Sequence, residues 1–198
     1  MQKIMFNERY GLQSAVFEGR KTQTRREPFY SDESVCFGFN RQGKLECFTY
    51  DDESEYLIHT SRYAKGEIVA VAQRYSEIAD EMKDAICVEE LGRFYVKPFI
   101  DTKGWNSKMF VRADLMLHHI KITNIRCERL QDISNEDCLK EGAFLLEEEG
   151  YRYYYIGNCE TKFYYAEHTF MYIISKLNGK KFWDTNPYMI VYEFELVD

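Results

Sequence analysis

The chain contains 198 residues, with 33 acidic side chains (Asp and Glu) against 26 basic ones (Lys and Arg) and a formal net charge of -7. This balance argues against extended binding to duplex DNA, because that binding depends on many basic side chains that neutralise phosphates. Hydrophobic residues at 45% and aromatic residues at 16% exceed what a disordered chain carries and can fill a globular core.

A single domain over residues 1–198 is predicted, since no Pro-, Gly- or Ser-rich linker divides the sequence. The six cysteines are scattered without a C-x-x-C pair and without a secretory signal before them, so neither a zinc ribbon nor a disulfide framework is expected. The sequence also lacks an apolar run of about 18 residues that could span a bilayer. We therefore expect a cytoplasmic protein with reduced thiols, no metal, no cofactor and no membrane association.

The first predicted element is a helix that Asn7 caps and Gly19 ends, with apolar side chains recurring on one face. Beyond it, short apolar or alternating runs predict strands, and helical spacing predicts helices. In chain order these elements are a hairpin with strands at 35–37 and 45–50, an acidic loop at 51–55, a buried strand at 66–72, a helix at 76–91 ended by Gly92, and strands at 109–111 and 119–123.

In the second half, Ser134 and Asp137 form a capping-box variant that begins a short helix, and Gly142 ends it. The remaining predicted elements are a hairpin with strands at 144–147 and 151–156, a helix with apolar residues from Phe163 to Leu177, and a final strand at 190–196 whose Glu193 and Glu195 face solvent. Short strands with interspersed helices, and no regular strand–helix repeat, predict an α+β fold built on a small mixed barrel.

Residues 17–26 read F-E-G-R-K-T-Q-T-R-R and crowd four basic side chains after a glycine. Such a cluster is either a solvated helix end or an anion or nucleotide site. A phosphate loop is excluded, because the upstream glycine is missing and the cluster follows a helix where it should open one. A histidine metal site is not expected either, since His118 and His119 point to opposite faces of a strand and His59 and His168 are isolated.

The pattern G-x-K-x-x-x-R at 19–25 resembles the signature of ASCH (activating-signal-cointegrator homology) domains of the PUA-like superfamily. Three further blocks resemble the family in its order: R-Y-A-K-G-E-I-V-A-V-A-Q-R-Y at 62–75, I-T-N-I-R-C-E-R-L-Q-D-I-S-N-E-D-C-L-K-E-G at 122–142, and F-W-D-T-N-P-Y-M-I-V-Y-E-F at 182–194. The resemblance implies a PUA-like mixed β-barrel with flanking helices, carrying insertions near 27–60, 76–108 and 144–162. It also implies a cleft beside the loop that takes RNA or a modified nucleoside.

Site residues follow from the same resemblance. Bacterial members that hydrolyse the acetyl amide of acetylcytidine use a lysine and a threonine from this loop and a glutamate from the short helix, which here are Lys21, Thr24 and Glu141. A lysine can act as the base in such a reaction only if desolvation or nearby positive charge lowers its pKa. The ligand-binding residues that the resemblance implies are Gly19, Arg20, Arg25, Arg26, Gln73, Arg74, Tyr75, Trp183 and Asn186.

Three functions stay open: binding of RNA or a modified nucleoside, hydrolysis of an acyl group from the exocyclic amine of a nucleoside, and an accessory domain that binds another protein. Residues 72–75 read A-Q-R-Y where larger relatives carry an R-E-T-W-like run, so an amide replaces a carboxylate that could act as a base. On a regular strand Lys21 and Thr24 would face opposite sides, so the enzyme requires an irregular loop. The tyrosines at 151 and 153–155 can stack on bases, although alternation turns some of them towards the core.

Overall fold

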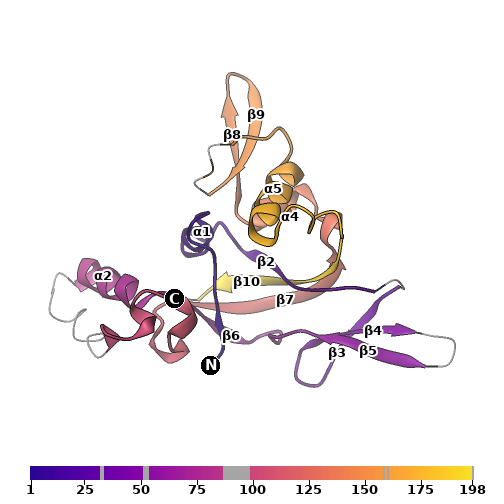
Figure 1. The fold of residues 1–198 in the computed structure, drawn as a ribbon, viewed down its shortest axis with the longest axis horizontal. Helices are drawn as coiled ribbons and strands as arrows, with labels where there is room; N and C mark the ends of the chain where they lie inside the picture. Colours follow the sequence, from indigo (N-terminus) through magenta and orange to yellow (C-terminus); the bar gives the residue numbers. More distant parts are fainter. Residues whose placement is uncertain (32–33, 51–53, 87–98, 158, 160, 198) are drawn as a thin grey trace. The chain divides into compact units, whose positions relative to one another are not determined.

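The computed structural model describes residues 1–31, 34–50, 54–86, 99–157, 159 and 161–197. Over these residues the chain has the predicted α+β composition, with helices and several β-sheets (Figure 1). Contacts divide the chain into two compact units. Unit 1 consists of Met1–Phe6, Ile68–Lys121 and Leu196–Asp198, and unit 2 consists of Asn7–Glu67 and Ile122–Glu195. None of the helices in the described part of the chain has the length and apolar character that spanning a bilayer requires.

In unit 1, β1 (Lys3–Ile4) pairs in parallel with β6 (Ile68–Val71), which pairs antiparallel with the first residues of β7 (His119–Arg129). The predicted buried strand at 66–72 is thus confirmed, with Val69, Ala70 and Val71 inaccessible to solvent. A strand with both faces buried reads as a continuous apolar run, which is how the sequence reveals it.

Helix α2 (Tyr75–Ile86) follows β6 and packs through Tyr75 and Ile78 into the core of unit 1. It confirms the first part of the helix predicted at 76–91, whereas the predicted end at Gly92 lies outside the described residues. The ring of Tyr75 lies so close to Gly104 that an added Cβ there would be 2.4 Å from ring carbon Cε2.

The strand predicted at 109–111 is wrong. Residues Lys108–Phe110 form one of three short 3-10 helices in this segment, the others being Lys103–Trp105 and Ala113–Leu115. The carbonyl oxygens of Met109 and Val111 accept hydrogen bonds from the Lys3 ammonium, at 2.9 and 2.6 Å. A side chain therefore satisfies backbone groups that a strand would have paired with a neighbouring strand.

In unit 2, β10 (Tyr188–Leu196) lies between β7 and β2 (Gln23–Phe29) and pairs antiparallel with β2. The final strand was predicted at 190–196, and Ile190, Tyr192 and Phe194 are buried as expected. Val191 is buried as well, so the first half of β10 is covered on both faces. The register shifts by one residue in β2, where Glu27 adopts a positive φ of 56°.

Helix α1 (Leu12–Phe17) begins later than predicted. Its N-cap is Gly11, at a left-handed φ of 64°, and Asn7 contributes only its carbonyl oxygen, which accepts from the Leu12 amide at 3.0 Å. The chain turns at a residue that tolerates positive φ, and the Asn7 side chain is not needed as a cap. The predicted end is confirmed, because Gly19 has a φ of 70° just after the helix.

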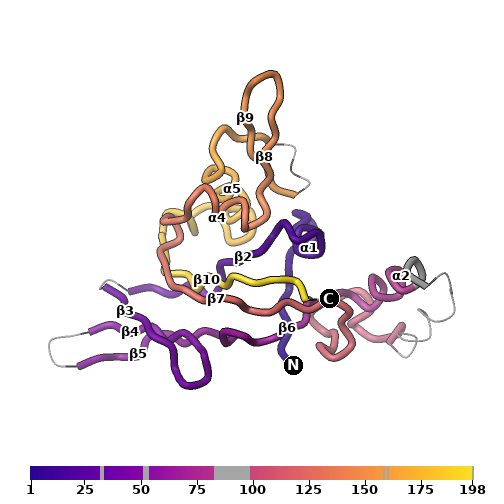
Figure 2. Tube along the Cα trace, turned by 180° about the vertical axis from the view of Figure 1, so that it is seen from behind, coloured from indigo at the N-terminus to yellow at the C-terminus, as the bar shows by residue number. Residues whose placement is uncertain are grey.

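Two β-hairpins of unit 2 were predicted and both are confirmed. The strands are β3 (Cys36–Phe39) and β4 (Leu45–Tyr50) in the first, and β8 (Ala143–Glu148) and β9 (Tyr151–Ile156) in the second. A third strand, β5 (Glu55–Thr60), pairs with β4 and was not predicted (Figure 2). Most of the acidic loop expected before it lies outside the described residues.

Two helices lie near the β8–β9 hairpin (Figure 1). The first, α4 (Asn135–Lys140), follows a short 3-10 helix (Leu130–Asp132) and is capped as predicted, with the Ser134 hydroxyl accepting from the Asp137 amide at 3.1 Å. The second, α5 (Ala166–Asn178), begins three residues after Phe163, which the sequence had placed in the helix. The backbone of Phe163 pairs instead with that of Tyr154 on β9, which holds it in an extended conformation.

Candidate functional site

The loop after α1 is folded back against the end of α4. Gly19 allows the turn, and the amides of Arg20 and Lys21 both donate to the Ala15 carbonyl, at 2.9 and 2.8 Å. The next amide, that of Thr22, donates to the Lys140 carbonyl at 2.9 Å. These backbone bonds place Lys21 beside the residue that caps α4, Glu141.

Lys21 and Glu141 form a buried ion pair in which Lys21 Nζ lies 2.6 Å from Glu141 Oε2. The same ammonium donates to the carbonyl oxygens of Glu141, at 2.8 Å, and Gln23, at 2.7 Å. Three acceptors match the three protons of a lysine ammonium. Both side chains are nearly inaccessible, with 2% of Lys21 and 5% of Glu141 exposed.

Arg25 extends this pair into a larger network. Its Nη1 lies 3.0 Å from Glu141 Oε1, and its Nη2 lies 3.3 Å from Asp137 Oδ2 and close to Glu128. Arg126 then pairs with Glu128, with Asp137 at 2.9 Å and with Glu193. We call these side chains the charged cluster: Lys21, Arg25, Arg126, Glu128, Asp137, Glu141 and Glu193. Three cations face four carboxylates, so each buried charge has a partner, as burial requires.

The pKa values of Lys21, Asp137 and Arg126 are shifted, and those of Lys21 and Asp137 bear on the chemistry of the cluster. Burial lowers the pKa of Lys21, Glu141 opposes that effect, and Arg26 and Arg25 add to it, so that the pKa lies below 10.5. Burial by itself would raise the pKa of Asp137, but Arg126 and Arg25 outweigh it and hold the pKa below 3.8. The pKa of Lys21 is therefore shifted in the direction that a lysine base requires, while Asp137 stays ionised at neutral pH.

A pH dependence of stability follows from Lys21. Its folded pKa lies below the unfolded value of 10.5, so between these values the unfolded chain binds more protons and stability rises with pH. We expect the free energy of unfolding of the wild type to increase relative to that of Lys21→Met as pH is raised from neutrality towards 10.5. Urea unfolding of both proteins at a series of pH values measures the difference. A difference that stays constant would contradict the lowered pKa.

Thr24 occupies a different position from the other two expected catalytic residues. It is buried in β2 opposite Tyr192, and alternation along the strand turns it away from the face on which Arg25 reaches Glu141. Within the described part of the chain, no hydrogen bond joins the Thr24 hydroxyl to Lys21 or Glu141. The irregular loop that the enzyme hypothesis required is present at Lys21, but it ends before Thr24.

Arg20 and Arg26 flank the cluster. The Arg20 guanidinium lies 3.8 Å above the ring of Phe144 and pairs with Glu18 at 2.6 Å. Burial lowers the pKa of Arg26, and the negative charge of Glu141 and Glu27 partly offsets this, which places Arg26 within the electrostatic reach of Glu141. The structure thus brings Arg20, Lys21 and Arg25 together, whereas alternation along β2 turns Arg26 to the same side as Thr24.

Trp183 and Asn186 make contacts that anchor the chain before β10. Trp183 is buried with its ring 6.3 Å from that of Phe170, over which Arg25 lies at 5.5 Å. Asn186 has a positive φ of 39°, and its Oδ1 accepts from the Gln131 amide at 2.9 Å. The ring of Phe170 therefore lies between Trp183 and Arg25 of the charged cluster. Asn186 stabilises the turn into the last strand.

Gln73, Arg74 and Tyr75 belong to unit 1. Gln73 donates through Nε2 to Glu81 at 2.7 Å, and Arg74 pairs with Glu77 at 2.8 Å. Tyr75 is a core residue whose hydroxyl accepts from the Arg112 amide at 2.9 Å. All three side chains have partners there, and their participation in a ligand site stays a prediction.

Four members of the cluster were not anticipated as site residues: Arg126, Glu128, Asp137 and Glu193. Arg126 and Glu128 are two positions apart on β7, so they share a face, which alternation could have revealed. The sequence predicted that Glu193 lies on the solvent face of the last strand. The Glu193 side chain is 31% exposed there and pairs with Arg126. Nothing local in the sequence indicates that these charges would meet.

Buried donors in this region without a hydrogen-bond partner among the described residues include Arg20 Nη1, Gln23 Nε2 and Arg25 Nε. In the same part of the chain, no group of three or more His, Cys, Asp or Glu side chains has the arrangement of a metal site. Comparison with protein-family models, curated proteins and solved structures finds no match to the chain. The charged cluster and the four sequence blocks are therefore the observations from which a function is proposed.

Proposed function

We propose that the chain is an ASCH-domain protein of the PUA-like superfamily that binds RNA or a modified nucleoside at the charged cluster. The observation that carries this proposal is the buried contact between Lys21 Nζ and Glu141 Oε2 at 2.6 Å, between residues 120 positions apart in the sequence. The resemblance to ASCH domains implies that this lysine and this glutamate lie in one site. The same proposal includes the PUA-like mixed barrel, of which β7, β10 and β2 would form one wall.

The polar groups of the cluster suggest which part of a ligand they hold. Gln23 Nε2 and Arg25 Nε are buried donors without an acceptor in the described part of the chain, and leaving such a group unpaired costs about 1–3 kcal/mol. A carbonyl oxygen of a pyrimidine base would supply the missing acceptor. A ligand can approach from the side of Arg126 and Glu193, whose side chains are 25% and 31% exposed.

The binding proposal predicts that replacing Lys21 weakens the affinity for the ligand. We expect the wild type to bind at least one member of a panel of nucleosides and short RNAs in isothermal titration calorimetry, and Lys21→Met to bind it at least about tenfold more weakly, because an ion pair at the site is lost. Lys180→Met removes an exposed lysine of the same unit and should leave the affinity unchanged. Near-UV circular dichroism identifies a variant that has not folded, and Arg126→Gln, at a partly exposed position, then provides a second test. Absence of binding across the panel, or unchanged binding by both variants, would refute the proposal.

Hydrolysis of an acylated nucleoside is the second candidate, and the lowered pKa of Lys21 beside a carboxylate favours it. In this reaction neutral Lys21 would take a proton from an attacking hydroxyl as its oxygen bonds to the acyl carbon. The C–N bond then breaks, and the exocyclic amine leaves with a proton delivered through Glu141. Because Thr24 faces away from Arg25, a water molecule is the nucleophile that the present geometry favours.

Acetate release from acetylcytidine distinguishes the two candidates. An amidohydrolase would convert acetylcytidine and water to cytidine and acetate, and Lys21→Met would abolish the turnover while Lys180→Met would not. If calorimetry shows binding but no acetate is released from any acylated nucleoside, the protein is a binding module.

A further inference from the structure

One face of the β8–β9 hairpin is lined with aromatic rings. The strand register places Phe144 opposite Tyr155, Leu146 opposite Tyr153 and Glu148 opposite Tyr151, and directly opposed residues project from the same face of a hairpin. Tyr164 joins this face, because its ring lies 5.2 Å from that of Tyr153. We call these rings the tyrosine face: Phe144, Tyr151, Tyr153, Tyr155 and Tyr164.

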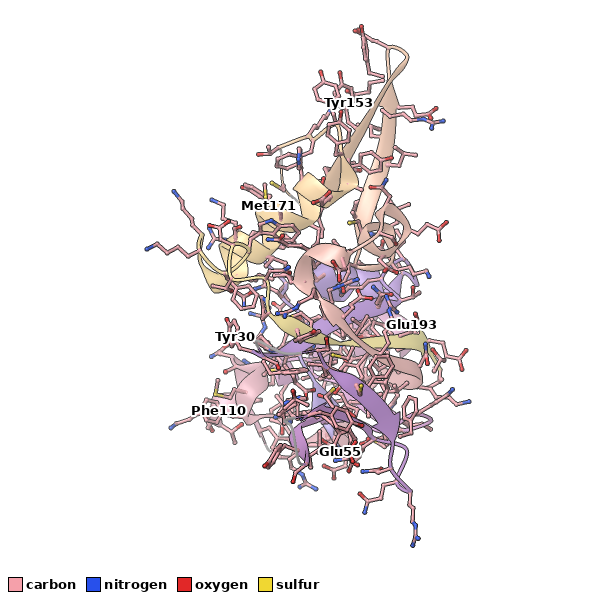
Figure 3. All side chains as sticks on the ribbon, turned by 90° about the vertical axis from the view of Figure 1, so that its right-hand side faces the viewer. Tyr30, Glu55, Phe110, Tyr153, Met171 and Glu193 are labelled. Carbon is pink, nitrogen blue, oxygen red and sulfur yellow. The ribbon has the colours of Figure 1, made fainter. Side chains whose placement is uncertain are left out.

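The rings of the tyrosine face lie close to one another, and Tyr151 and Tyr164 are exposed to solvent, whereas Phe144, Tyr153 and Tyr155 are half-buried. Phe144 and Tyr155 are stacked with centroids 4.8 Å apart and an interplanar angle of 11°, and Tyr151 lies 6.4 Å from Tyr153. Tyr151 is 60% exposed and Tyr164 is 64% exposed. Figure 3 shows Tyr153 on this hairpin, at the opposite end of the view from Glu55 on β5. Packing within the chain does not account for the exposed rings of Tyr151 and Tyr164.

Cations lie on these rings and connect them to the charged cluster. The Arg20 guanidinium lies over the ring of Phe144 at 3.8 Å, Phe144 also stacks with Tyr155, and Arg20 directly precedes Lys21. The Lys162 ammonium lies 5.8 Å from the centroid of Tyr153. Aromatic rings with cations between them can bind a nucleic acid, because the rings stack on nucleobases and the cations attract phosphates.

The acidic residues of the hairpin limit how much of the binding can be electrostatic. Glu147 pairs with Arg152 at 2.8 Å on the other face, and Glu148 pairs with Lys162 at 2.5 Å. The local charge is therefore nearly balanced. Binding at this surface should depend on stacking more than on counterion release, and its affinity should fall only weakly with salt.

We propose that the tyrosine face stacks the bases of single-stranded RNA that extends from a nucleoside held at the charged cluster. The inference rests on the proposed function, since the cluster supplies one end of the site. Under this inference the ligand is an RNA strand and not a free nucleoside. Arg20 and the stacked pair Phe144–Tyr155 extend the binding surface from the charged cluster along the hairpin.

Fluorescence anisotropy with a labelled short RNA of mixed sequence tests this inference, with the corresponding mononucleotide as competitor. We expect the RNA to bind more tightly than the mononucleotide, and the double variant Tyr151→Ala/Tyr153→Ala to bind the RNA about tenfold or more weakly while its mononucleotide affinity is unchanged. The corresponding Phe variants keep the rings and should bind as the wild type does. Tyr56→Ala, at an exposed tyrosine of β5, should have no effect.

The outcomes separate this inference from the function on which it rests. If the mononucleotide binds but the RNA gains nothing in affinity, or the double Ala variant binds RNA as the wild type does, the tyrosine face is not an RNA surface while nucleoside binding stands. If neither ligand binds, both proposals fail. If RNA does not bind and the double Ala variant dissociates a self-associated wild type in sedimentation analysis, the face binds protein and the inference is overturned.

Discussion

Glu141→Gln is expected to lower the free energy of unfolding by about 3–5 kcal/mol, because breaking a buried ion pair from one side leaves an uncompensated charge. Glu141 is the shared partner of Lys21 and Arg25, at 2.6 and 3.0 Å. The glutamine amide can still accept one hydrogen bond, but it carries no charge to balance the ammonium. Arg25 keeps Asp137 and Glu128, so the loss falls mainly on Lys21.

A double-mutant cycle distinguishes the loss of the Lys21–Glu141 ion pair from a general disturbance of the loop. In Lys21→Met/Glu141→Gln no unpaired ammonium remains, so the double variant should be less destabilised than the sum of the two single variants by about 2 kcal/mol. Glu147→Gln provides the control, since its pair with Arg152 is exposed on both sides, 61% and 71%, and its loss should change stability by less than about 0.5 kcal/mol. Equilibrium urea unfolding measures the wild type and all four variants. Additive effects in the cycle, or a Glu141→Gln protein as stable as the wild type, would show that the pair does not carry this energy.

The same cluster explains why part of the site was not predictable from the sequence. Strand β2 reads Q-T-R-R-E-P-F and has no alternating apolar pattern, because its buried side chains are a glutamine, a threonine and an arginine, and ion pairs hold the arginine. Hydrophobic periodicity detects strands that bury apolar side chains and misses one that buries charges. The partners of Arg25 at 128, 137 and 141 lie more than a hundred residues away, and only the fold brings them together.

Features fixed by local chemistry were predictable. The Ser134 cap, the positive φ of Gly19 and Gly142, and the turns of both hairpins follow from residues within a few positions of one another. The 3-10 helix at Lys108–Phe110 was missed because a distant lysine, Lys3, binds its carbonyl groups. Local pattern thus predicted most of the helices and strands but missed β2 and β5, and it could not detect the long-range ion pairs that form the site.

The second large effect is expected at Gly157, which follows β9. A Cβ built on Gly157 would lie 1.6 Å from the Tyr10 carbonyl oxygen and 3.1 Å from the Gly11 nitrogen, and its φ of 54° is left-handed. The atoms that the new Cβ would meet belong to the backbone of Tyr10 and Gly11, so no side chain can rotate away to make room. Gly157→Ala must therefore separate the end of the hairpin from the segment before α1, and we expect it to cost about 3 kcal/mol or more in free energy of unfolding.

Gly150→Ala isolates the steric part of this cost. Gly150 also has a positive φ, 82°, but nothing lies within 4 Å of its added Cβ, so only the strain of about 1 kcal/mol remains. Urea unfolding of the two variants should differ by about 2 kcal/mol or more, and similar stabilities would mean that Gly157 does not approach Tyr10 this closely. The contact has a further consequence for the site, because Tyr10 and Gly11 begin α1, whose end sets the loop that carries Lys21. A Gly157→Ala protein that folds at low temperature should therefore bind ligand more weakly than Gly150→Ala, although neither residue touches the charged cluster.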